Sequence, residues 1–225
     1  MPSLSVGIYC EATDWMILKA FVCRTLQKKP SEIEVIETPS KGGSFATFAG
    51  ALPTFLHKYY KQCVSLVVVC TDNDGKIDLT RPGAPSEDPK HPRHARHAGQ
   101  RLEACRHCVL EEKVKDARPA LRYLPPKDGM HWPIVVTVPV EAIESWLLTA
   151  RALVTQGDKY MRAEDLPGGS RLKTAFYGRP FVTTPDVISK ALPVINDPAL
   201  DLSDLAAYSP SFRLFVESLQ AADLS

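Results

Sequence analysis

The residues that most constrain the fold are 64–69 (VSLVVV), an apolar run interrupted by Ser65 alone. Cys70 extends the run, and the polar stretch TDNDG at residues 71–75 ends it. A β-strand with apolar side chains on both faces is typical of a parallel sheet that helices cover on each side. The run therefore predicts a central strand of such a sheet, with Asp72 and Asp74 placed where the strand ends.

The segments on either side of this run alternate between strand-like and helix-like patterns. Strands are predicted at 4–10, 33–37 and 133–139, and helices at 15–26, 44–62, 100–118 and 140–154. Pro53 is expected to start or kink the main part of the second helix. This order predicts an α/β fold with a mostly parallel four-stranded sheet flanked by helices. In such folds ligands bind at the carboxyl ends of the strands.

The pattern also predicts a domain organisation. Residues 1–156 form the α/β core, which carries a long basic, His-rich insertion at about 76–122. Residues 157–225 form a small helical C-terminal extension packed on the core, with short helices near 184–192, 202–206 and 210–221. Residues 76–98 fit neither period, so a long loop is expected beside the strand ends.

Composition narrows the class of protein. The 225 residues are 44% hydrophobic and 24% charged, with a net charge of +1, which is typical of a folded domain and argues against a uniformly basic nucleic-acid coat. The six cysteines mostly lie in apolar segments, as reduced core thiols do. The N-terminal residues show neither a signal peptide nor a membrane span. We therefore expect a cytoplasmic protein without a membrane partner.

Carboxylates follow three of the four predicted strands. Glu11 follows the first, Asp72 and Asp74 follow the third, and Glu141 and Glu144 open the helix after the fourth. Several carboxylates in one crevice repel one another unless a cation neutralises them, and oxygen ligands suit a hard divalent ion. These five residues are therefore the predicted ligands of Mg²⁺ or Mn²⁺.

Each of these acids also has a simpler interpretation. Asp72, Asn73, Asp74 and Gly75 are the residue types that form turns, and Glu141 and Glu144 could be first-turn acids that favour the helix dipole. A calcium loop of the EF-hand type fits less well, because no Glu occupies its twelfth position. The coincidence of acids at successive strand ends favours the metal site.

The basic insertion suggests contact with nucleic acid. Between Pro89 and Arg122 there are nine Lys and Arg residues against four Asp and Glu residues, together with four of the six histidines. Positive charge of this kind binds phosphates, although a charged helix face that only solubilises the protein fits as well. The candidate phosphate contacts are Arg93, Arg96, Arg101 and Arg106. The spacing of His91, His94, His97, Cys105, His107 and Cys108 does not match structural zinc modules, so zinc is not expected.

The motifs VGIYCEATD and VVVCTDNDG resemble the Toprim domain of topoisomerases, primases and OLD-type nucleases, whose pattern is an apolar strand with Glu followed by a strand with Asp-x-Asp. More narrowly, VEAIESWLL and YSPSFRLFVESL resemble a Toprim-like family of unknown function. Together these segments span most of the chain. One departure is Ala12, where the Toprim pattern has Gly; the change is mild if the backbone there needs no positive φ.

The resemblance implies roles for individual residues. Glu11 would lie near the metal or act as a general base, Asp72 and Asp74 would bind the same ion, and Glu144 and Glu141 would match the ligands of a second ion in OLD-type nucleases. Two such ions activate a water and stabilise the leaving oxygen in phosphodiester hydrolysis. Lys173 would correspond to a lysine that neutralises charge on the phosphoryl group, although it could equally be a plain surface lysine.

Three functions follow from these observations. The first is a divalent-metal-dependent Toprim-like nuclease that acts on DNA or RNA, with a role as effector of a prokaryotic anti-phage defence system implied by family association alone. The second is a non-catalytic Toprim-like subunit that binds nucleic acid or a partner ATPase; the chain carries no P-loop, so such an ATPase would be a separate protein. The third is a nucleotidyl or phosphoryl transferase. Whether the chain forms a homo-oligomer stays open.

Overall fold

The computed structural model describes residues 4–37, 44–72, 106–121, 132–140, 142–166, 169–222 and 224. The chain divides into two units. The first, called the sheet unit, comprises Met1–Cys70, Leu102–Thr137 and Ser218–Ser225. The second, called the helical unit, comprises Thr71–Arg101 and Val138–Glu217.

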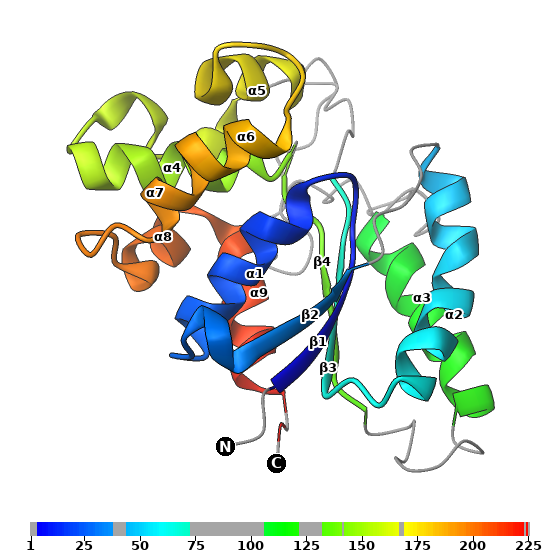
Figure 1. Cartoon of the computed structure of the whole chain (residues 1–225). Coiled ribbons are helices and arrows are strands. Elements are labelled where there is room, and N and C mark those ends of the chain that lie inside the picture. The colour runs from blue at the N-terminus through cyan, green and yellow to red at the C-terminus, as the bar shows by residue number, and fades with distance from the viewer. Residues whose placement is uncertain are drawn as a thin grey trace. The chain divides into compact units, whose positions relative to one another are not determined.

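The described part of the sheet unit contains a four-stranded parallel sheet in the order β2-β1-β3-β4 (Figure 1). The strands are β1 (Leu4–Tyr9), β2 (Ile33–Glu37), β3 (Leu66–Cys70) and β4 (Ile134–Thr137). Val6 on β1 pairs with Val35 on β2 and with Leu66 on β3. Every residue of β3 is buried, which follows from its continuous apolar sequence. The predicted α/β fold with a parallel four-stranded sheet flanked by helices is confirmed.

Helices cover both faces of this sheet. Helix α1 (Asp14–Thr25) lies on one face, and α2 (Phe45–Lys61) and α3 (Arg106–Leu121) lie side by side on the other, as Figure 1 shows. A short 3₁₀ turn, η1 (Pro30–Glu32), precedes β2. The chain leaves β1 toward β2 and leaves β3 toward β4, so the direction of winding reverses between β1 and β3. Ligand sites of open α/β sheets form beyond the carboxyl ends of the strands at such a reversal.

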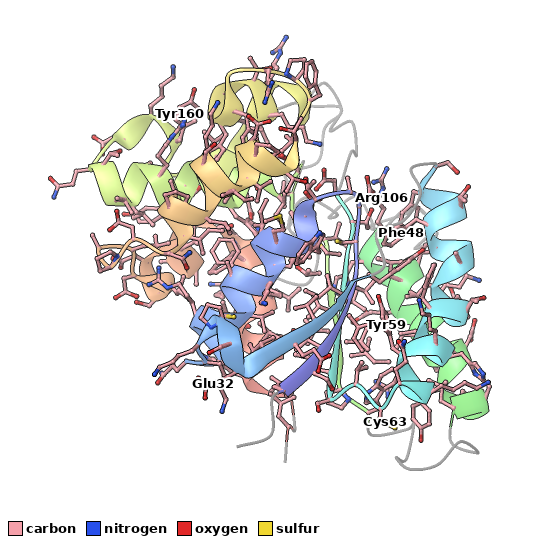
Figure 2. All side chains as sticks on the ribbon, in the orientation of Figure 1. Glu32, Phe48, Tyr59, Cys63, Arg106 and Tyr160 are labelled. Carbon is pink, nitrogen blue, oxygen red and sulfur yellow. The ribbon has the colours of Figure 1, made fainter. Side chains whose placement is uncertain are left out.

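Helix α2 is fixed to the sheet by two tyrosine hydroxyls. Tyr59, which Figure 2 shows between α2 and the sheet, donates a hydrogen bond to the carbonyl of Ile8 at 2.8 Å. Tyr9 on β1 donates to the carbonyl of Phe48 at 2.9 Å, and its ring centroid lies 4.3 Å from that of Phe48. Burial, and to a lesser degree the Glu11 carboxylate, raises the pKa of Tyr9 to about 12, so its hydroxyl stays a donor at physiological pH.

The helical unit is organised around α4 (Glu144–Thr155), which contacts α5, α7 and α8. All residues from Glu144 to Ala150 are buried, and the Trp146 ring stacks on Phe215 with its centroid 5.4 Å away. The other elements of the helical unit are η4 (Asp158–Tyr160), η5 (Ala163–Asp165), α5 (Gly169–Tyr177), α6 (Thr184–Asp186), the π-helix η6 (Val187–Ala191), α7 (Leu192–Ile195), α8 (Leu202–Tyr208) and α9 (Pro210–Gln220), whose last residues belong to the sheet unit. Helices are thus present where the sequence predicts them near 184–192, 202–206 and 210–221.

Two helices differ from the sequence prediction. Helix α4 begins at Glu144, four residues later than predicted, because the Ile143 N–H is bound by a side chain from another segment, described below. Helix α5 was not predicted; it is short, and its buried apolar side chains are Leu172, Phe176 and Tyr177. Pro53 lies inside α2 and does not start it, since Ser44 caps the helix by accepting the Thr47 N–H at 3.3 Å.

Two further expectations concern cysteines and membranes. Among the described cysteines, Cys10, Cys23 and Cys70 are buried, as expected of core thiols, and Cys63 is exposed. None of the helices in the described part of the chain combines the length and the apolar character that a membrane span requires.

The packing of Tyr59 predicts that Gly7 cannot be replaced without loss. A Cβ at Gly7 would lie 2.8 Å from two atoms of the buried Tyr59 ring, which the bond to Ile8 holds in place. We expect Gly7→Ala to lower the free energy of unfolding by about 1–3 kcal/mol, measured by urea denaturation followed by circular dichroism.

Gly50 provides the matched control. It is exposed in α2, and a Cβ there would meet nothing within 4 Å. Gly50→Ala should therefore raise the free energy of unfolding by about 0.5–1 kcal/mol. If Gly7→Ala and Gly50→Ala shifted the free energy of unfolding in the same direction, the assigned contact between Gly7 and Tyr59 would be contradicted.

Candidate functional site

Asp72 lies two residues beyond β3 and is buried in the helical unit. One carboxylate oxygen, Oδ1, accepts the backbone N–H of Ile143 at 3.0 Å, immediately before α4. The other, Oδ2, lies 3.6 Å from Nζ of Lys173 on α5. Asp72 therefore binds the start of one helix and a cation from another, and it carries its negative charge at the positive end of α4.

Glu144 is the first residue of α4 and is only 1% exposed. Burial raises the pKa of its carboxyl group, the nearby Asp72 carboxylate raises it further, and Lys173 lowers it in part, so that the pKa lies at about 8. Its Oε2 atom is buried and has no hydrogen-bond partner among the described residues. Glu144 is therefore mostly protonated at neutral pH, and it has an oxygen available for a ligand.

Lys173 owes its position to the packing of α5 against α4. Arg151 on α4 donates to the carbonyls of Ala175 at 3.0 Å and Phe176 at 3.3 Å, which lack helical partners at the end of α5. The Arg151 guanidinium also lies 4.9 Å from the centroid of the Phe176 ring. These contacts present Lys173 toward Asp72, with about a third of its side chain exposed. The structure thus brings together Asp72, Glu144 and Lys173 of the predicted site.

The other predicted site residues belong to the sheet unit or lie outside the described residues. Glu11 follows β1 in the sheet unit and is partly exposed. Arg106 begins α3, where its guanidinium lies 4.8 Å from the centroid of the Phe45 ring. The buried His107 places Nδ1 3.6 Å from Glu111 one turn later. Outside the described residues lie Asp74, Glu141, Arg93, Arg96, Arg101, His91, His94, His97 and Cys105.

Ala12 has a φ of 43°, in the left-handed region that glycine adopts without strain. The Toprim pattern has Gly at this position, and the backbone conformation explains why glycine suits it. The alanine of this chain leaves about 1–2 kcal/mol of strain in the turn after β1. The departure from the pattern is therefore not mild in physical terms, although the chain keeps the turn.

A divalent ion fits the helical-unit site only in part. Asp72 and Glu144 supply two carboxylates, and the buried Oε2 of Glu144 is an oxygen without a protein partner. Among the described residues, no group of three or more His, Cys, Asp or Glu side chains is placed to hold a metal ion. Magnesium prefers six oxygen ligands and commonly keeps several waters. The two carboxylates would therefore hold an ion with the help of water and of further ligands.

Sequence reasoning missed a further buried carboxylate in the helical unit. Glu164 accepts hydrogen bonds from the hydroxyls of Ser209 and Ser211 and from the Ser211 N–H at 3.4 Å. Ser211 in turn accepts the indole N–H of Trp146 on α4 at 2.8 Å. The signal available in the sequence is Ser-Pro before an apolar helix, a typical cap with proline at the first helical position. These bonds attach the start of α9 to α4, so Glu164 has a structural role.

The fold and the site together define an α/β protein with a parallel sheet, whose helical unit holds a buried acidic pair beside a lysine. A scan against protein-family models, a search of curated proteins and a search of solved structures each found no match to this chain. The resemblance to Toprim-like proteins therefore rests on the sequence motifs, and the chemistry must be argued from the side chains.

The raised pKa of Glu144 predicts a pH dependence of stability. In the folded protein Glu144 binds a proton with a pKa of about 8, whereas in the unfolded chain it releases the proton near the ordinary Glu pKa of 4.5. Between these values the folded state holds the extra proton, so its stability falls as pH rises through the window and levels off above it. We expect a fall of up to about 1.4 kcal/mol per pH unit, measured by urea denaturation in EDTA.

Glu144→Gln isolates this contribution, because the amide keeps the shape of the side chain but cannot titrate. The difference in free energy of unfolding between the two proteins should change steeply between about pH 5 and pH 8. Parallel curves for the two proteins across this range would contradict a raised pKa at Glu144.

Proposed function

We propose that the protein is a divalent-metal-dependent nuclease that hydrolyses phosphodiester bonds of DNA or RNA at a Toprim-like site. The observation that carries the proposal is the buried pair of Asp72 and Glu144 beside Lys173. Two carboxylates and one lysine at the start of a buried helix match the ligand and cation roles that phosphoryl transfer requires. As effector of an anti-phage defence system, the nuclease would act on invading nucleic acid.

The residues of this chain would have distinct roles in that reaction. Asp72 and Glu144 would hold Mg²⁺ or Mn²⁺, which when bound polarises the phosphoryl group and activates a water. Glu144 would lose its proton on binding the ion, since a carboxylate rather than a carboxylic acid is the ligand. Lys173, partly exposed, would contact an oxygen of the phosphoryl group and neutralise developing charge.

Further residues are assigned roles on the basis of the sequence pattern. Glu11 would act as ligand or general base, and Asp74 and Glu141 would complete the oxygen ligands. Phosphates of the nucleic acid would bind the basic residues Arg93, Arg96, Arg101 and Arg106. The contact with the Phe45 ring does not neutralise the Arg106 guanidinium, so this guanidinium could still bind a phosphate.

A second candidate function is a non-catalytic subunit that binds nucleic acid or a partner ATPase. The observation that favours it is that Asp72 already has two protein partners, the Ile143 N–H and Lys173. In this alternative Asp72 holds the start of α4, Lys173 supplies the countercharge in place of an ion, and Glu144 stays protonated.

Nuclease assays distinguish the two candidates. Plasmid, single-stranded DNA and tRNA are incubated with the protein in Mg²⁺ or Mn²⁺, and products are resolved by gel electrophoresis. We expect Asp72→Asn, Glu144→Gln and Lys173→Met each to lower the cleavage rate by about 100-fold or more, because each removes a ligand or a charge that the transition state needs. Glu11→Gln tests the base in the same way.

Asp204→Asn is the matched control, since Asp204 is an exposed acid in the first turn of α8. It should cleave like the unaltered protein. Cleavage that persists unchanged in Asp72→Asn and Glu144→Gln would refute the site. Cleavage of no substrate, with no heat of Mg²⁺ or Mn²⁺ binding by calorimetry, would favour the non-catalytic subunit.

A further inference from the structure

Phe181 is the most exposed large apolar side chain in the described part of the chain. It lies between α5 and α6 in the helical unit, and 63% of it is exposed. Ile188 and Tyr208 are the other large apolar side chains that the described residues expose, at 53% and 38%. An aromatic ring exposed to this degree offers a face on which a flat ligand can stack.

The ring has a preorganised cation against it. The Arg179 guanidinium carbon lies 5.4 Å from the Phe181 ring centroid. Arg179 is itself held by Asp186, to which it donates a hydrogen bond, and by the Thr183 hydroxyl at 3.4 Å. Asp186 also accepts the Thr183 N–H at 2.9 Å and the Thr183 hydroxyl at 2.6 Å. Arg179 is therefore fixed beside the ring at the start of α6.

The Asp186 carboxylate stays ionised at all physiological pH values. The hydroxyl of Thr183, together with Arg179, lowers its pKa to about 2. Titration of Asp186 therefore does not break its ion pair with Arg179 at physiological pH, and this pair holds the guanidinium beside the ring in the absence of a ligand. Preorganisation of this kind reduces the entropy that binding must overcome.

The surrounding segment carries excess positive charge. Residues 169–191 contain four basic side chains, Arg171, Lys173, Arg179 and Lys190, against one acidic side chain, Asp186. Arg171 is exposed on α5, two residues before Lys173 of the candidate site. A polyanion is therefore a better match to this surface than an apolar protein face, which would remove these charged groups from water without compensation.

We propose that the segment from α5 to α6 binds single-stranded nucleic acid, with an unpaired base stacked on the exposed face of Phe181 and phosphates near Arg171 and Lys173. Aromatic rings bind bases of any sequence by stacking, and the bases of a duplex are already stacked on one another. The inference rests on the proposed function, because the bound strand would be the substrate, and it makes that substrate single-stranded.

Binding is tested apart from cleavage, in EDTA, by fluorescence anisotropy with short labelled DNA and RNA strands and a duplex of the same sequence. The unaltered protein should bind the single strands more tightly than the duplex. Phe181→Ala should weaken single-strand binding by about 5- to 100-fold, whereas Phe181→Tyr, which keeps the ring, should stay within about twofold. Ile188→Ala is the control for loss of an exposed apolar side chain and should bind like the unaltered protein.

The inference would be overturned if the unaltered protein bound no single strand, if Phe181→Ala bound single strands as the unaltered protein does, or if Phe181→Ala lost affinity equally for strand and duplex. Loss of binding in Ile188→Ala as large as in Phe181→Ala would instead indicate an apolar partner surface and would also overturn it. The nuclease assay is scored separately. Binding that depends on Phe181, without cleavage of any substrate, would refute the nuclease and support the single-strand site. Cleavage together with unchanged binding by Phe181→Ala would support the nuclease and refute the single-strand site.

Discussion

The hydrogen bond between the Ile143 N–H and the Asp72 carboxylate determines where α4 begins. The first N–H groups of a helix have no partner within the helix, and a carboxylate that accepts one also places negative charge at the positive end of the helix dipole. Because α4 is the helix on which α5, α7 and α8 pack, this bond sets the position of much of the helical unit. It also fixes Glu144, the next residue, close to a second carboxylate.

The proximity of these two acids explains the charge state of the site. With Glu144 protonated, the Asp72 carboxylate and the Lys173 ammonium group balance each other. If Glu144 loses its proton, these three side chains together carry one excess negative charge, which a low-dielectric interior disfavours strongly. The site is therefore built to accept one further positive charge, and a proton or a metal ion can supply it.

Much of the fold was predictable because it depends on local patterns. The apolar run that became β3 and the alternation of strands and helices suffice to predict a parallel sheet flanked by helices. The start of α4 was not predictable, because Asp72 that determines it is 71 residues away in sequence. Helix α5 depends on Arg151, which binds its terminal carbonyls from another helix.

The candidate site was predictable to a similar extent. Asp72 and Glu144 follow from the rule that residues after parallel strands gather at one edge, whereas Lys173 was found by the Toprim resemblance alone. Glu164 was not found, since no pattern near it in the sequence indicates the serines that bind it 45 and 47 residues later.

Glu144 differs in its surroundings from two other buried acids of the helical unit. Glu164 and Asp186 each accept several hydrogen bonds, and donors lower the pKa of Asp186 to about 2, whereas burial raises that of Glu144 to about 8. A carboxyl group whose ionised form is disfavoured by its surroundings on balance destabilises the fold, and such groups persist where a ligand or a reaction uses them. Glu144, rather than the better-bonded acids, is therefore the residue around which a function should be sought.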